Sequence, residues 1–195
     1  MTRRSFIGGA AAMAATGCIN NNLDVNNTSN PAALEVSKNW FKEAQFGMMA
    51  HWGLYSLLAG EYKGRRVRDY AEWIQSFMAI PNEEYSRLAK VFNPVYFNAD
   101  EWIRLAKDAG MEYFVFTSKH HDGFAMFHSK ADPFNVVDAT PFGRDIIAEL
   151  AAACKKHGLR FGLYYSQYVD WHEEHGGGYL SGHIPCAGAA WCNQW

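Results

Sequence analysis

The sequence predicts an α/β fold built on a parallel sheet, because short buried strands alternate with amphipathic helices along the chain. Three runs at 46–50, 113–117 and 160–165 have the length and hydrophobicity of strands. Right-handed crossovers through the intervening helices would make these strands parallel neighbours. Since a barrel of eight strand–helix units needs about 250 residues, we expect these 195 residues to be the front part of a larger domain.

Four helices are expected between these strands. Apolar residues at 102, 105, 106 and 109 keep helical spacing after Asp100, and Gly110 ends that helix. A second stripe over 146–154 leads to basic residues and then to Gly158. Shorter helices are expected over 70–77 and over 85–92, the latter just after Pro81.

Composition narrows the class of protein. Hydrophobic residues make up 49% of the chain and aromatic residues 15%, so a buried core is expected. The formal charge of −2 gives no basic surface, which argues against nucleic acid as a partner. No apolar run approaches the roughly 20 residues that span a bilayer, so an integral membrane protein is not expected.

Residues 1–17 have the pattern of a bacterial export signal, with Arg3 and Arg4 before a short apolar run. The opening resembles a twin-arginine signal, and the residues leading to Cys18 resemble a lipobox. We expect an exported protein, periplasmic or membrane-anchored through lipid on Cys18; the alternative is an ordinary cleaved signal with an incidental cysteine. Residues 18–37 are expected to be a flexible tether, and 38–195 the folded part.

The other three cysteines do not define a disulfide framework or a reactive site. Cys154 falls within a helical stripe and is expected to be a buried apolar residue. Cys186 and Cys192 could pair in an oxidising compartment, but their spacing leaves this open.

Polar and aromatic residues cluster where each strand ends. His51 and Trp52 follow the first strand and His120, His121 and Asp122 the second; the third ends in Tyr164 and Tyr165, before Asp170, Trp171 and His172. Ligands bind at this edge of parallel α/β folds. Imidazole, phenol and indole groups can hydrogen-bond hydroxyls and stack on a sugar ring. In the alternative reading these residues are structural, and Trp73 and Trp102, on helical stripes, are expected in the core.

A metal site is the alternative interpretation of some of these residues. His120, His121 and Asp122, and the 172–175 segment His-Glu-Glu-His, offer groups that zinc accepts. However, the spacing is not the His-Glu-x-x-His of zinc proteases, and no Cys-x-x-Cys occurs. We therefore expect neither a metal nor another cofactor, and a metal-dependent hydrolase remains the least favoured alternative.

Several blocks of the chain, taken together in order, resemble the α-L-fucosidases of glycoside hydrolase family 29. The most specific is Lys119-His120-His121-Asp122-Gly123-Phe124. The other blocks are Phe46-Gly47 through His51-Trp52-Gly53-Leu54-Tyr55-Ser56, then Ala71-Glu72-Trp73, Asn135-Val136-Val137-Asp138, Arg144-Asp145-Ile146 and Phe161-Gly162-Leu163-Tyr164-Tyr165-Ser166.

The resemblance implies the N-terminal portion of a (β/α)₈, TIM-like barrel, incomplete in this chain. It also implies retaining hydrolysis of terminal α-L-fucosyl linkages in fucosylated glycans. By the same resemblance the fucose hydroxyls are held by a set of five residues: His51, Glu72, His120, His121 and, as the choice between two tyrosines, Tyr165.

The family's nucleophile and acid/base belong to later blocks, so we expect them beyond Trp195 and assign no catalytic residue here. A retaining enzyme needs two carboxyl groups about 5–5.5 Å apart, so the 195 residues alone are expected to be inactive. The alternative function is a non-catalytic carbohydrate-binding protein.

Overall fold

The computed structural model describes residues 39–173. Residues 1–40 form one unit, and the chain from Phe41 forms a second, which holds the sheet and its helices. The export signal, the tether, Cys18, Cys186 and Cys192 lie outside the described residues. Within 39–173, no helix has the length and hydrophobicity needed to span a membrane.

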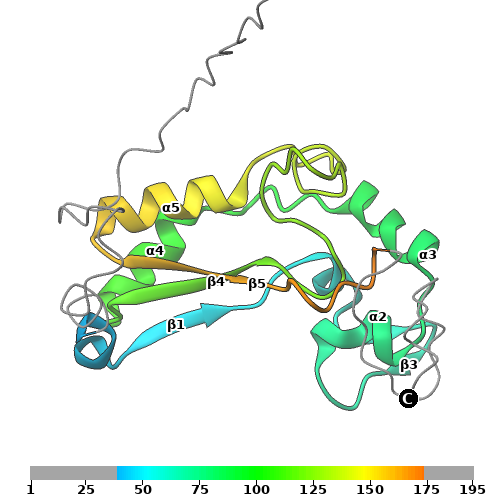
Figure 1. Cartoon of the computed structure of the whole chain (residues 1–195), viewed down its shortest axis with the longest axis horizontal. Coiled ribbons are helices and arrows are strands. Elements are labelled where there is room, and N and C mark those ends of the chain that lie inside the picture. Colours follow the sequence, from blue (N-terminus) through cyan, green and yellow to red (C-terminus); the bar gives the residue numbers. More distant parts are fainter. Residues whose placement is uncertain (1–38, 174–195) are drawn as a thin grey trace, which may run out of the picture. The chain divides into compact units, whose positions relative to one another are not determined.

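The centre of the second unit is a parallel three-stranded sheet with the order β1-β4-β5 (Figure 1). Its strands are β1 (Gly47–Ala50), β4 (Tyr113–Lys119) and β5 (Arg160–Tyr165). Met48 pairs with Phe114, which pairs with Phe161 across the sheet. The α/β class and the parallel sheet are thus confirmed, whereas closure into a barrel is not part of what these residues show.

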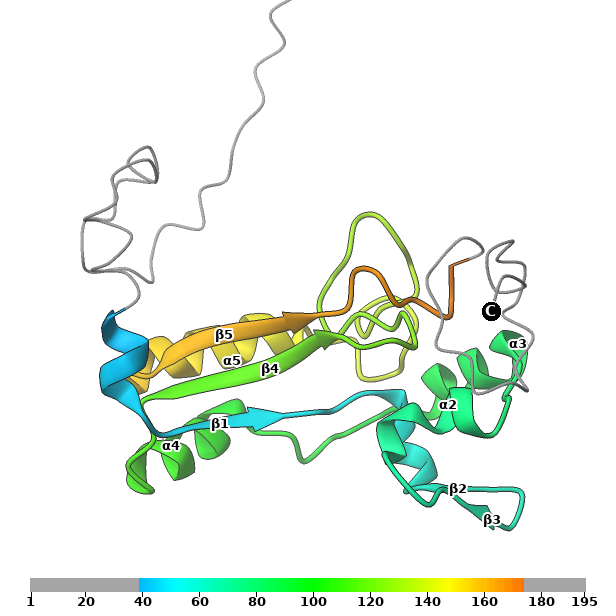
Figure 2. The same cartoon turned by 60° about the horizontal axis from the view of Figure 1, so that its bottom comes forward.

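Helices α4 (Ala99–Asp108) and α5 (Ile146–His157) lie side by side on one face of the sheet, as both views show (Figures 1 and 2). The hydrophobic core lies between them and the sheet, where Phe114, Phe116, Ile103 and Leu150 are fully buried. Burying side chains of this size contributes about 1.5–3 kcal/mol each. This layer holds the strands in register and so fixes where their ends lie.

The two long helices follow their sequence signals closely. The Asp145 side chain caps α5 by accepting a hydrogen bond from the Ala148 N–H at 2.9 Å, and Gly158 ends it at φ +70°. Helix α4 begins two residues earlier than expected, because the Asn98 side chain caps it by accepting from the Glu101 N–H. Asp100 instead pairs with Lys156 and His157 of α5.

The segment between β1 and α4 is more broken than the sequence predicts. Each of the two short predicted helices divides into a 3-10 turn and an α-helical turn. The pieces are η3 (Ala71–Trp73), α2 (Ile74–Phe77), α3 (Asn82–Ser86) and η4 (Arg87–Val91). A 3-10 helix η2 (Leu54–Leu58) and a hairpin of β2 (Glu61–Tyr62) and β3 (Arg65–Arg66) precede them and were not predicted.

Candidate functional site

A group of aromatic rings gathers at the C-terminal edge of the sheet, and we call it the ring cluster. Its members are His51, Tyr55, Trp73, His120, His121, Tyr164 and Trp171. The ring of His120 lies 5.3 Å from that of His51 and 4.3 Å from that of His121, between centroids. His51 also lies 5.8 Å from Tyr164. Residues that follow three different strands therefore meet in one place, as their positions in the sequence predict.

Hydrogen bonds between strand ends hold this arrangement. The Trp52 N–H donates to Thr117 Oγ1 at 3.0 Å, which fixes the chain directly after His51 against β4. The Ser118 hydroxyl donates to the Tyr164 carbonyl at 2.8 Å and ties β4 to β5. The backbone next to His51 and the backbone of Tyr164 are thus both bonded to β4.

Both adjacent histidines join the cluster because β4 ends at Lys119. Within a strand, neighbouring side chains point to opposite faces. His120 and His121 lie beyond the strand, where the chain bends, so both rings reach the same side. His120 is buried, at 3% exposure, while His121 is partly buried.

Tyr164, rather than Tyr165, is the tyrosine in contact with the histidines. Tyr164 pairs with Thr117, and its ring lies 5.9 Å from that of His120. Tyr165, which the sequence analysis preferred, points to the opposite face of β5, is 51% exposed and lies under the Lys119 ammonium group. The alternation of side chains along β5 separates the two tyrosines.

The short helices bring two further residues to the site. Trp73 was expected in the core, but its ring packs edge-on against His121 at 4.8 Å and against Trp171 at 5.5 Å. Its neighbour Glu72 is partly buried, and its carboxylate offsets part of the lowering that burial imposes on the pKa of His121. Trp102 does lie in the interior, against Trp52 and Phe97.

Two imidazoles of the cluster, those of His120 and His121, are held in the neutral form. Burial, together with the nearby His121 and His51, lowers the pKa of His120 to about 3. Burial also lowers the pKa of His121. His120 Nδ1 is buried and has no hydrogen-bond partner among the described residues. Neutral imidazoles can both donate and accept, which suits them to hydroxyl groups.

Two buried carboxylates, Asp122 and Asp170, lie next to cluster members in the chain, Asp122 after His121 and Asp170 before Trp171. Asp122 accepts from the Tyr85 hydroxyl at 2.8 Å and from the Phe124 N–H at 3.2 Å, and burial raises the pKa of Asp122 to about 6. Asp170 pairs with the Lys119 ammonium group and accepts from the His172 N–H at 3.0 Å. Both carboxylates are therefore occupied by structural partners.

The chain turns tightly between these carboxylates at Gly123, which has φ +77°. A Cβ at this position would lie 2.5 Å from the Cβ of His172 and 2.6 Å from Asp170 Oδ1. Only glycine combines this conformation with so close an approach. The turn brings the loop that carries Trp171 against the end of β4, where the Trp171 N–H donates to the His121 carbonyl at 2.7 Å.

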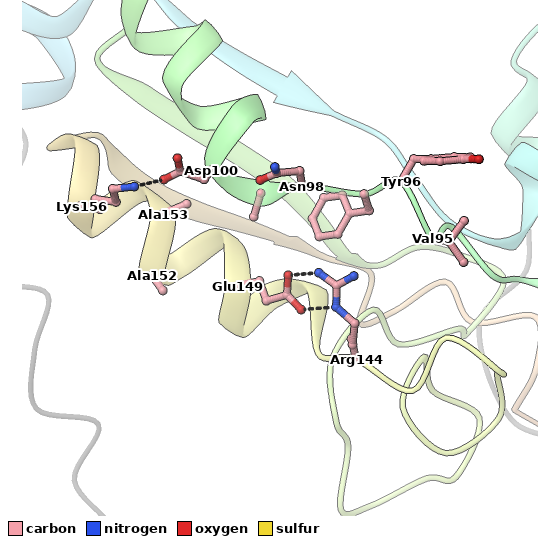
Figure 3. Close-up of a pocket in the computed structure, with 11 residues that line it drawn as sticks. Val95, Tyr96, Asn98, Asp100, Arg144, Glu149, Ala152, Ala153 and Lys156 are labelled. Carbon is pink, nitrogen blue, oxygen red and sulfur yellow. Dashed lines mark hydrogen bonds and ion pairs between the residues drawn. The ribbon is translucent and has the colours of Figure 1, made fainter.

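A separate hollow of about 580 Å³ lies between α4 and α5, on the helical face of the sheet (Figure 3). Arg144 and Glu149 form a two-pronged ion pair there, and Lys156 pairs with Asp100. Because these charges neutralise one another, the hollow offers fewer unsatisfied groups to a sugar than the ring cluster does.

The structure also bears on the metal alternative. Within residues 39–173, no group of three or more His, Cys, Asp or Glu side chains is arranged to hold a metal ion. His120 and His121 instead contact aromatic rings, and Asp122 faces Tyr85.

Neutral imidazoles, a phenol, indole rings and a carboxylate around one strand edge define a site suited to a carbohydrate. Comparison with known proteins agrees: the α-L-fucosidase family model matches residues 12–181. The chain belongs to the α-L-fucosidase family.

Individual relatives give the same family. Rat tissue α-L-fucosidase is 35% identical over 141 residues, which cover 68% of this chain and 30% of the relative. The unliganded structure of α-L-fucosidase AlfC from Lactobacillus casei is 63% identical with a TM-score of 0.72, over 80% of this chain and 48% of that one. An α-L-fucosidase from Vibrio sp. strain EJY3 is 50% identical with a TM-score of 0.70, over 72% of this chain and 24% of that one. The chain thus spans under a third of the rat relative and about half of AlfC.

Proposed function

We propose that the complete gene product is an α-L-fucosidase that hydrolyses terminal α-L-fucosyl linkages in glycans with retention of configuration. The observation that carries this proposal is the ring cluster, in which His51, His120, His121 and Tyr164 meet at one strand edge. Family membership supports the choice of fucose. A single-substitution variant of AlfC has been crystallised with Fucα(1,6)GlcNAc and with 4-nitrophenyl-α-L-fucopyranoside, which supports fucosides as the ligand class.

In this proposal the cluster binds the sugar in two ways. His51, His121 and Glu72 hydrogen-bond its hydroxyls, since imidazoles and a carboxylate provide the necessary donors and acceptors. Trp73 and Tyr164 present aromatic faces to its apolar side. We assign the tyrosine role to Tyr164 because its ring, and not that of Tyr165, contacts the histidines.

The chemical step needs a nucleophile and an acid/base, two carboxyl groups about 5–5.5 Å apart. Asp122 and Asp170 do not suit these roles, because Tyr85 and Lys119 engage them. We propose that both catalytic carboxyl groups come from outside residues 39–173 and that the described residues act in binding.

The test is release of nitrophenol from 4-nitrophenyl α-L-fucoside by the complete gene product, with the anomeric product followed by NMR. Retention would appear as α-L-fucose released first. Initial release of β-L-fucose would contradict the mechanism. Binding of fucose without hydrolysis would instead identify a non-catalytic carbohydrate-binding protein, and loss of activity in chelator a metal-dependent hydrolase.

We also propose that residues 1–17 export the protein and that Cys18 carries lipid, on the strength of the twin-arginine and lipobox patterns alone. Labelling cells with a radioactive fatty acid tests this. Label should appear in the wild-type protein and be absent from the Cys18→Ala variant; equal labelling of both would contradict lipidation.

A further inference from the structure

Ser166 lies directly after β5 and touches the cluster through His121. Its hydroxyl oxygen is 2.6 Å from His121 Nδ1 and 2.5 Å from the Val169 carbonyl oxygen. Ser166 is buried, and its own N–H donates to the Lys119 carbonyl at 2.9 Å. The Ser166 hydroxyl is therefore fixed between His121 Nδ1 and the Val169 carbonyl, because its own backbone is bonded to Lys119 of β4.

The protons of this chain of contacts can be assigned from its chemistry. A carbonyl oxygen only accepts hydrogen bonds, so the single Ser166 proton is directed to Val169. Ser166 Oγ is then the acceptor toward His121, and His121 Nδ1 must carry a proton. If Nδ1 carried no proton, the single Ser166 hydroxyl proton would have to serve two contacts, one with the Val169 carbonyl and one with His121 Nδ1. One of the two would then be left without a proton.

Burial lowers the pKa of His121, so the ring is neutral near pH 7 and its one N–H proton is at Nδ1. Nε2, on the other side of the ring, is left with a lone pair. Trp73 and Trp171 flank the ring, at 4.8 and 5.5 Å between centroids, and restrict its rotation.

We infer that Ser166 is a positioning residue that fixes His121 as the Nδ1–H tautomer, so that Nε2 accepts a hydrogen bond from a hydroxyl of bound fucose. This inference deepens the proposed function and rests on it for the identity of the sugar. It gives the two adjacent histidines different roles: His121 is a directed acceptor, while His120, whose Nδ1 has no partner among the described residues, is not fixed in this way.

The first measurement is the tautomer of His121, read by ¹H–¹⁵N NMR of the unliganded complete gene product with ¹⁵N-labelled histidine. The signal is assigned by its loss in His121→Asn. Wild-type protein should show a protonated Nδ1 and an unprotonated Nε2. A protonated Nε2 in the wild type would overturn the inference. This result does not depend on activity, so absence of fucoside hydrolysis would count against the proposed function alone.

The second measurement compares Ser166→Ala with two variants, using 4-nitrophenyl α-L-fucoside. Ser166→Ala should populate both tautomers and raise KM about tenfold, the value of one hydrogen bond. Ser166→Thr, which keeps the hydroxyl, should restore the wild-type tautomer. Ser86→Ala removes another hydroxyl that donates to a carbonyl three residues away, at 3.3 Å, and should leave both readouts unchanged. An unchanged tautomer and KM in Ser166→Ala would refute the positioning role.

Discussion

Replacing Asp122 with Asn should change how the stability of the protein depends on pH. Asp122 is 1% exposed, and burial raises its pKa from the ordinary 3.8 to about 6. Between pH 3.8 and about pH 6, Asp122 keeps its proton in the folded protein but has released it in the unfolded chain. The stability that this proton provides is complete below about pH 4 and is lost as pH rises through 6.

The size of the effect follows from that interval. At about 1.36 kcal/mol per pH unit, the ionised Asp122 makes the folded state about 3 kcal/mol less stable at pH 7.5 than a neutral group would. An Asn side chain can still accept from the Phe124 N–H but cannot accept the Tyr85 proton as a carboxylate does. That loss, about 1 kcal/mol, is the same at every pH.

The assay is urea denaturation of the complete gene product at pH 4 and pH 7.5. The unfolding free energy of Asp122→Asn minus that of the wild type should be about 2–3 kcal/mol higher at pH 7.5 than at pH 4. Asp108→Asn, at an exposed ion pair with Arg104, should change stability by less than about 0.5 kcal/mol at both. A variant that is equally destabilised at both pH values would refute the reasoning, because the pKa of Asp122 would then be the same in the folded and the unfolded protein.

Two further predictions concern the ring cluster, and a third concerns the 195-residue chain by itself. Tyr164→Ala should lower kcat/KM for nitrophenyl fucoside about 30- to 150-fold, from loss of roughly 2–3 kcal/mol of contact. Tyr165→Ala should change kcat/KM less than about threefold, and the reverse order would contradict the assignment of Tyr164. Burial and neighbouring imidazoles lower the pKa of His120 to about 3, so its ring stays neutral above about pH 4. Protonation of His120 should therefore cause no loss of fucose affinity, measured by calorimetry, between pH 7 and pH 5. A loss of affinity over this range that is absent in His120→Gln would contradict this. The 195-residue chain expressed alone should release no nitrophenol, and measurable release would show that it contains both catalytic carboxyl groups.

The sequence predicts the layout of the site well because the strands are strongly marked. Apolar runs before His51 and His120 locate two strand ends, and the C-terminal edges of parallel strands must coincide. The stop at Gly158 is an equally local signal, and α5 ends where it predicts. These features are predictable because they depend on residues that are close together in the sequence.

Features that depend on distant contacts were missed. The choice between Tyr164 and Tyr165 requires the register of β5 on β4, which no run of residues specifies. Trp73 lies on an apolar stripe like a core residue, but its helix breaks into two short turns and presents the ring to His121. The contact of Ser166 with His121 spans 45 residues and has no local signature.

The central claim is that fucose binds in the ring cluster, and a crystal structure of the complete gene product with L-fucose tests it most directly. The account predicts the sugar against Tyr164 and Trp73, with hydroxyls within hydrogen-bond distance of His51, Glu72 and His121 Nε2. Fucose bound instead in the hollow between α4 and α5, with the ring cluster empty, would contradict it.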